Sequence, residues 1–145
     1  MNDDAEIIWD VWVSQYCIMG NKCGIYRCSD DHEVQMITST ILVLTGTSSR
    51  AEAQAIVDAA IAQRLAAAAQ VIGPVASTYR WDGAIAHTDE WLCLLKTTAP
   101  LYDALEQTIR ALHSYALPGI LAIPVVAGSP PYLAWLAQEV RQDTT

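Results

Sequence analysis

The segment LHSYALPG, residues 112–119, carries the side chains best suited to chemistry in the regular part of this chain. A neutral imidazole such as that of His113 is a common ligand for copper, zinc and nickel. Alternatively, a histidine at the end of a helix donates to free carbonyl groups and complements the helix dipole. Tight coordination takes three or four protein ligands, and no Cys, Asp or Glu stands beside His113. We therefore favour the helix-end role and keep a metal site at His113 as the alternative.

A wider set of residue types would suit a binding cleft. Aromatic faces, one ammonium group and one imidazole could line a cleft between subunits and hold a small anion or a nucleotide-like ligand. Tyrosine and tryptophan in hairpins also pack across strands, and a lysine at a strand end is often solvated, so the sequence leaves both interpretations open. The candidate cleft residues are Tyr79, Trp81, Lys96, His113 and Tyr115.

A second candidate metal site lies near the N-terminus, where Cys17, Cys23, Cys28 and His32 follow the order C-x5-C-x4-C-x3-H. Three thiolates and an imidazole would satisfy tetrahedral zinc and would fold a segment that lacks a core. The segment is acidic, however, and lacks the basic residues of RNA-binding fingers. We favour a poorly ordered extension over residues 1–36. Met36, just before the first expected strand, also permits the hypothesis that the biological start lies there.

Regular elements must position the cleft candidates. We expect strands at 37–46, at 69–81 and 89–98 around a tight turn at Asp82-Gly83, and at 119–128. Helices are expected from Ser49, where Ser49 and Glu52 have capping-box spacing, from about Thr98, and from Ser129. The second helix should bury Leu101, Leu105, Ile109 and Leu112, and the last should bury Leu133, Leu136, Ala137 and Val140.

The resulting order is β-α-β-β-α-β, which predicts an α+β, ferredoxin-like domain over residues 37–145, with two helices on one face of an antiparallel sheet and a short C-terminal helix. Residues 89–98, DEWLCLLKTT, are apolar at both alternating sets of positions. Because two helices cover only one face, the other face needs a second cover, and another subunit is the simplest choice. Cys93 within this strand is expected to be a small buried apolar residue.

Composition restricts the classes of partner. The formal net charge is −8 and the eight basic residues are scattered, which argues against nucleic acid. No apolar run suits a transmembrane span, so we expect a cytoplasmic protein with reduced thiols. The chain also lacks a nucleophile elbow, a phosphate-binding glycine loop and a matched acid–base pair, so we expect no enzymatic activity.

Several separated motifs resemble the CutA family of divalent-cation tolerance proteins over about residues 40–138. They are Tyr79, Trp81 and Gly83, then Lys96-Thr97, His113 with Tyr115, Pro118, Pro124-Val125, and the run Tyr132-Leu133-Trp135-Leu136. The resemblance implies a homotrimer of ferredoxin-like subunits similar to PII signalling proteins, a role in the response to metal ions, and an association with copper. An alternative is a PII-like signalling or scaffold trimer that binds a small molecule between subunits.

The chain departs from that family where metal ligands would be expected. Ala68 stands where the family usually has Cys, and Ala116 and Gly119 stand where it commonly has Glu. These substitutions remove a soft thiolate and two carboxylates, which are groups that a divalent metal site would use. The resemblance therefore supports the trimer and the cleft more directly than it supports a metal site in this chain.

Overall fold

The computed structural model describes residues 26–28, 34–36 and 38–142, and the chain divides into two units, residues 1–38 and 39–145. In the first unit, β1 (Tyr26–Cys28) and β2 (Val34–Met36) pair in an antiparallel manner. The second unit contains the segments whose sequence resembles the CutA family.

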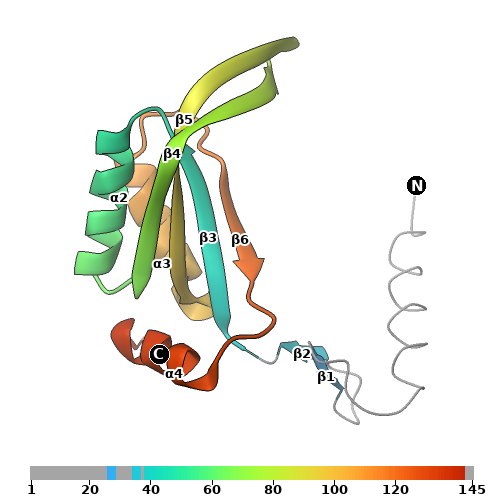
Figure 1. Cartoon of the computed structure of the whole chain (residues 1–145), viewed down its shortest axis with the longest axis vertical. Helices are drawn as coiled ribbons and strands as arrows, with labels where there is room; N and C mark the ends of the chain where they lie inside the picture. Colours follow the sequence, from blue (N-terminus) through green and yellow to red (C-terminus); the bar gives the residue numbers. More distant parts are fainter. Residues whose placement is uncertain (1–25, 29–33, 37, 143–145) are drawn as a thin grey trace. The chain divides into compact units, whose positions relative to one another are not determined.

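The second unit is the predicted α+β, ferredoxin-like domain. Its strands β3 (Thr40–Thr47), β4 (Ala68–Trp81), β5 (Ala84–Thr98) and β6 (Ile120–Pro124) form one antiparallel sheet in the order β4-β5-β3-β6. Helices α2 (Arg50–Ala62) and α3 (Tyr102–Leu112) lie together on one side of it, and α4 (Pro130–Glu139) lies at the end of the sheet (Figure 1). A short 3-10 turn, η1 (Ala99–Leu101), leads from β5 into α3.

The core lies between the sheet and the two helices. Alternate residues of β3 and β5 point toward it, so that Val43, Cys93 and Leu95 are fully buried. From the helices, Ile56 of α2 and Ile109 of α3 pack against them. The free thiol of Cys93 donates to the carbonyl oxygen of Ala53 at 3.6 Å, and burial, followed by the negative charge of Glu52, raises its pKa to about 11. Cys93 is thus the buried apolar residue that the sequence predicted.

The helix boundaries follow local chemistry. Ser49 caps α2 by accepting the backbone N–H of Glu52 at 3.2 Å. The Glu52 carboxylate does not complete the predicted capping box, because it accepts hydrogen bonds from Ser48 and Ser114. Two predicted inward residues are wrong: Leu112 is 42% exposed because it ends α3 beyond the helix–sheet contact, and Ala137 is exposed on α4.

Arg64 holds α4 against the domain. It follows α2 with a positive φ of 55°, and its guanidinium donates to the carbonyl oxygens of Gln138 and Glu139 at 2.7 and 2.8 Å. These carbonyls belong to the last turn of a helix, where no intrahelical donor is available. The arginine side chain therefore fixes the C-terminal end of α4.

The long β4–β5 hairpin extends beyond the rest of the sheet, and we call residues 75–90 the arm (Figure 1). Asp82 and Gly83 make its turn with φ values of 48° and 78°, the left-handed conformations that the Asp-Gly pair predicts. At the base of the arm the pairing shifts between Ile72 and Val75. A Cβ atom on Gly73 would lie 2.9 Å from the ring of Trp91, so only glycine fits there.

The sheet face opposite α2 and α3 is apolar, and within residues 38–142 neither of these helices covers it. Strand register places on this open face the residues Leu42, Leu44, Ile72, Leu92, Leu94, Leu121 and Ile123. Ile72, Leu121 and Ile123 are 49%, 66% and 46% exposed. The same side continues onto the arm through Tyr79 and Trp81, which are paired with Ala86 and Ala84.

Candidate functional site

The residues with the richest polar contacts meet at the root of the arm. There the end of β3, the start of α2, the arm and the loop after α3 come together. We call Gly46, Glu52, Glu90, His113 and Tyr115 the arm-root cluster, because each is joined to another by a hydrogen bond or close polar contact.

His113 is fixed on both ring nitrogens. Nε2 lies 2.9 Å from the carbonyl oxygen of Gly46, which can only accept, so Nε2 carries a hydrogen. Nδ1 lies 3.2 Å from both the backbone nitrogen of Tyr115 and Glu52 Oε1, and the side chain is fully buried. The histidine follows the last residue of α3, but its side chain bonds a carbonyl of β3, so the predicted bond to its own helix is wrong.

Glu52 ties the loop after α3 to the start of α2. Its carboxylate accepts the backbone N–H of Ser114 at 2.7 Å, the hydroxyl of Ser114 at 3.0 Å and the hydroxyl of Ser48 at 2.9 Å. Burial raises the pKa of Glu52, but these hydrogen bonds and the nearby His113 outweigh burial, and the net shift is downward. The carboxylate is therefore held in its ionised form, and it positions the segment that carries His113 and Tyr115.

Tyr115 and Glu90 form the outer part of the cluster. The phenol of Tyr115 donates to Glu90 Oε1 at 3.0 Å. Burial, this hydrogen bond and the charge of Glu90 raise the pKa of Tyr115 to about 12, with smaller effects from Tyr79 and Glu52. A Cβ atom on Gly46 would lie 3.2 Å from Glu90 Oε2, so the glycine leaves room for this carboxylate.

The five cleft candidates do not all meet within one subunit. His113 and Tyr115 are adjacent, with ring centroids 5.0 Å apart, and Tyr79 and Trp81 lie on the arm. Lys96 lies six residues from Glu90 on β5, about 20 Å away along an extended strand. There its ammonium group donates to the hydroxyl of Tyr132 at 3.2 Å and lies 5.5 Å from that ring.

No set of three or more His, Cys, Asp or Glu side chains within residues 38–142 is arranged to hold a metal ion. His113 has one carboxylate beside it, that of Glu52. The N-terminal candidates Cys17, Cys23 and His32 lie outside the described residues, and of Cys28 only the backbone, in β1, is described. His87 is exposed on the arm, where Nδ1 lies 3.0 Å from Thr78 Oγ1.

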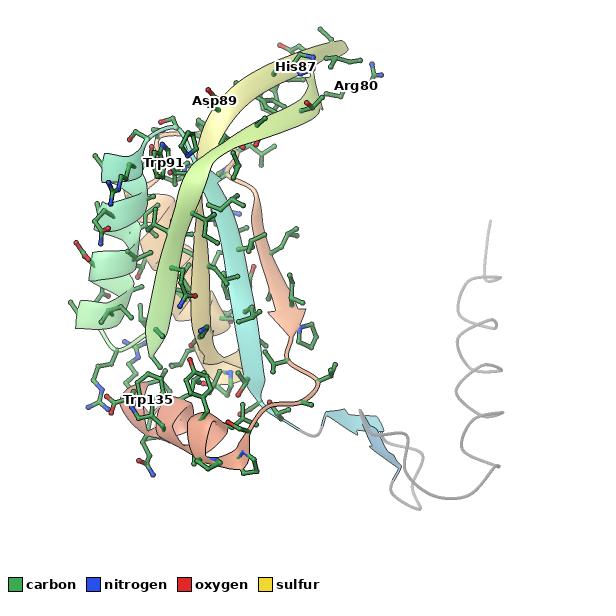
Figure 2. The ribbon with its side chains drawn as sticks, viewed as in Figure 1. Arg80, His87, Asp89, Trp91 and Trp135 are labelled. Atoms are coloured by element: carbon green, nitrogen blue, oxygen red, sulfur yellow. The ribbon has the colours of Figure 1, made fainter. Side chains whose placement is uncertain are left out.

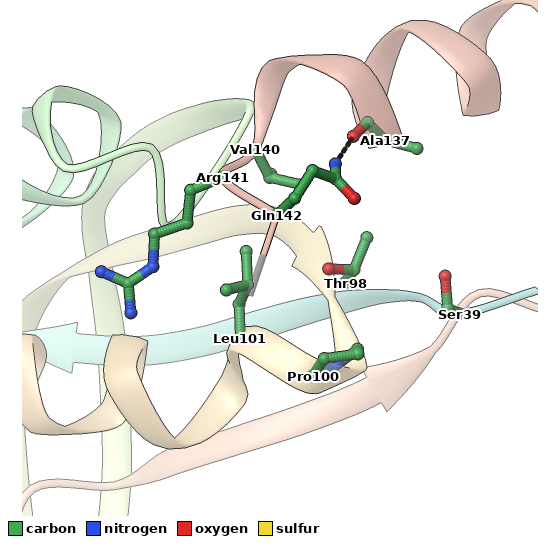
Figure 3. Close-up of a pocket in the computed structure, with 8 residues that line it drawn as sticks. All are labelled: Ser39, Thr98, Pro100, Leu101, Ala137, Val140, Arg141 and Gln142. Atoms are coloured by element: carbon green, nitrogen blue, oxygen red, sulfur yellow. Dashed lines mark hydrogen bonds between the residues drawn. The ribbon is translucent and has the colours of Figure 1, made fainter. Parts of the chain in front are cut away.

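A separate pocket of about 180 Å³ lies between the start of α3 and the end of α4 (Figure 3). Its lining includes Thr98, Pro100 and Val140, and Gln142 at its edge bonds back to the carbonyl oxygen of Ala137 at 2.9 Å. None of the cleft candidates lines it. We therefore place the candidate site at the arm root.

The βαββαβ order, the extended arm and the polar cluster at its root define a ferredoxin-like α+β protein whose sheet has an apolar open face. Residues 41–139 match the family described as CutA1 divalent ion tolerance protein. The chain belongs to this family, as its sequence motifs indicated.

Individual relatives agree with this assignment. The chain is 36% identical over 97 residues to the divalent-cation tolerance protein CutA of Thermus thermophilus, which covers 67% of this chain and 94% of that protein. The crystal structure of CutA from Xylella fastidiosa matches with a TM-score of 0.70 and 34% identity, over 72% of this chain and 100% of that one. A structure described as the periplasmic divalent cation tolerance protein CutA from Archaeoglobus fulgidus matches with a TM-score of 0.68 and 27% identity, over 70% and 99%.

Within the part of the chain that the structure describes, no helix has the length and apolar character needed to cross a membrane.

Proposed function

We propose that this chain acts as a homotrimer in the response to divalent metal ions, with copper(II) as the first ion to test. The observation that carries the assembly is the open face, a continuous apolar surface on β3, β4, β5 and β6. Membership of the CutA1 family supports the role in ion tolerance. We further propose that the protein is cytoplasmic, has no enzymatic activity and does not bind nucleic acid, consistent with its net charge of −8.

The open face is too apolar to remain in water. Leu121 and Ile72 alone leave about half or more of their area exposed, and Leu42, Leu44, Leu92 and Leu94 lie between them. Burying such a surface yields roughly 25 cal/mol per Å² of apolar area, so its association with other copies is favourable. The arm extends this face past the other strands of the sheet (Figure 1), so it can contact a neighbouring copy.

Metal binding by this chain needs more than one subunit. His113 is the candidate ligand, yet its Nε2 donates to Gly46 and its Nδ1 faces Tyr115 N and Glu52. A metal ion at Nδ1 would displace the Tyr115 contact and would need further ligands from a neighbouring copy. Ala68, Ala116 and Gly119 offer none.

The enclosed position of His113 favours a second candidate function, a PII-like trimer with a small-molecule cleft. Here His113 shapes the loop, and the aromatic groups of Tyr79, Trp81 and Tyr115 contact the ligand. Tyr79 and Trp81 are 40% and 54% exposed, as ligand-binding or interface aromatics would be in a free subunit.

A calorimetric copper(II) titration of the full chain separates the two functions. The matched variants are His113→Ala at the arm root and His87→Ala at the exposed position on the arm. Binding with a defined stoichiometry that is lost in His113→Ala and kept in His87→Ala would support a metal site. Absence of specific binding would contradict the copper proposal and favour an organic ligand of the cleft.

A further inference from the structure

The open face carries two charged side chains within its strands. Register places Lys96 opposite Leu42 and Ala68, and it places Glu90 opposite Val75. The other residues of β3–β6 on this side are uncharged, so Lys96 is the one base and Glu90 the one acid on that surface of the described strands. A subunit that covers this face must also cover these two charges.

Each of the two charges has a neutral partner within its own chain. Lys96 donates to the Tyr132 hydroxyl at 3.2 Å, and Glu90 Oε1 accepts the Tyr115 hydroxyl at 3.0 Å. Neither contact supplies an opposite charge. Burying an ammonium or carboxylate group without one costs several kcal/mol, whereas burying them together recovers much of that cost.

The two groups cannot pair within one subunit. They lie six residues apart on the same strand, which separates their Cα atoms by about 20 Å. An ion pair between them can therefore form only between copies of the chain.

Other carboxylates are placed less well for Lys96. Asp89 alternates with Glu90 and points to the opposite side of the arm, the side that carries Arg80 and His87 (Figure 2). Asp82 is exposed in the turn at the tip of the arm. Glu90 is the carboxylate on the face that a neighbour would cover.

We infer that, in the proposed trimer, Lys96 of one subunit pairs with Glu90 of the next. The two groups lie toward opposite ends of the open face, Glu90 at the root of the arm and Lys96 beside Tyr132 of α4. In a head-to-tail contact, one end of the open face of each subunit meets the other end of the open face of the next. Such contacts close into a ring when the rotation that relates neighbouring subunits is a whole fraction of a full turn.

This pairing also completes the cleft. Tyr79, Trp81, His113 and Tyr115 come from one subunit, and Lys96 comes from its neighbour. The cleft is thus absent from the monomer and is assembled together with the oligomer. The inference rests on the proposed homotrimer, and its test must separate the two.

Zero-length cross-linking with a carbodiimide suits this chain because its sequence contains two lysines, Lys22 and Lys96. In a Lys22→Arg variant of the full chain, Lys96 is the only lysine. We expect the reagent to condense the Glu90 carboxylate with the Lys96 amine, with loss of water, and to give covalent dimers and trimers. Peptide mass spectrometry identifies the link. Addition of Glu90→Gln should abolish these products, whereas the matched control Glu106→Gln on α3 should retain them.

Light scattering of the same Lys22→Arg sample separates the possible failures. An oligomer that gives no Lys96–Glu90 link, or that links equally in Glu90→Gln, overturns the pairing and leaves the assembly standing. A monomeric mass overturns both.

If Glu90→Gln does not fold, charge reversal decides. Each single variant, Lys96→Glu or Glu90→Lys, is expected to fail to assemble. Assembly that is restored in the double variant supports the pair. A double variant that assembles no better than the single ones overturns it.

Discussion

Glu52 makes more hydrogen bonds than any other side chain of the arm-root cluster. It accepts three hydrogen bonds, two of them from Ser114, which precedes Tyr115. The loop that presents Tyr115 is therefore fastened to α2 through an ionised carboxylate. Hydrogen bonds to charged groups contribute more to stability than neutral ones, typically about 1.5–3 kcal/mol.

We predict that Glu52→Gln lowers the free energy of unfolding by about 2 kcal/mol at neutral pH. Because the folded-state pKa of Glu52 lies below its ordinary value, its contribution is present above that value and is lost as the pH falls through the folded-state pKa. The wild type should thus lose its advantage over Glu52→Gln on acidification. Urea unfolding at several pH values measures this, and an advantage that does not change with pH would contradict it.

The contribution of Tyr115 to stability has the opposite pH dependence, because it is lost at high pH. Its pKa in the folded protein is raised to about 12, so its contribution is complete below the ordinary tyrosine pKa and is lost as the pH rises through 12. We predict that the wild type is destabilised between about pH 10 and pH 12 more than Tyr115→Phe is. Phenolate absorbance and urea unfolding of both proteins test this, and parallel stability profiles would contradict it.

At this scale the sequence indicated His113 and Tyr115 but missed Glu52, Glu90 and Gly46 as their partners. The hydrogen bonds in question join residues 62, 25 and 67 positions apart. Sequence spacing reports neighbours on one helix or strand, whereas these contacts depend on how the sheet and helices pack. A capping-box pattern even assigned the Glu52 carboxylate to the wrong backbone group.

The base of the arm depends on a close approach of Gly73 in β4 to Trp91 and Glu90 in β5. At its base, a Cβ atom on Gly73 would lie 2.9 Å from the ring of Trp91 and 3.0 Å from the carbonyl oxygen of Glu90. Both neighbours belong to β5, which pairs with β4 along nearly its whole length. The backbone of β4 therefore reaches this position only without a side chain.

We predict that Gly73→Ala destabilises the protein by about 1–3 kcal/mol, the usual cost of forcing an extra methyl group into a packed site. Gly119→Ala is the matched control, because a Cβ atom there meets nothing within 4 Å. Thermal unfolding of the two variants measures the difference. Equal midpoints would show that Trp91 moves aside without cost.

The order and type of the elements could be predicted, because alternation, capping residues and the Asp82-Gly83 turn are local signals. The strand predicted at 37–46 is observed as Thr40–Thr47, and the hairpin turn lies where Asp-Gly predicted it. The exposure of Leu112 and Ala137 could not be predicted. Helical periodicity continues past the point where the partner surface ends, so it does not show which of its last residues are covered.

For the whole molecule, β5 separates two surfaces. Trp91 points toward α2 (Figure 2), where Arg50 lies 5.7 Å from the centre of its ring. Strand register places Leu94 on the open face. A charge on the α2 side is therefore expected to affect folding of the subunit, and a charge on the open face is expected to affect its self-association.

We predict that Trp91→Asp prevents stable folding of the subunit, because it removes an indole that packs against the core and puts a carboxylate in its place. Leu94→Asp should instead leave a folded subunit and reduce its self-association. Circular dichroism reports folding and light scattering reports mass. If both variants remained folded oligomers, the two-surface description of β5 would be wrong.

The sequence predicted that a second face of the sheet needs a cover, since residues 89–98 are apolar at both sets of alternating positions. One strand does not predict the number of copies, which the family resemblance alone suggested, or the Lys96–Glu90 pairing inferred above. They depend on which ends of the open face meet when copies associate.

The most direct test of this account is the mass of the full chain in solution, measured by sedimentation equilibrium over a range of concentrations. We predict a single species with three times the 15.8 kDa mass of the chain. A monomer that persists at high concentration would contradict it, because the open face would then remain uncovered in water.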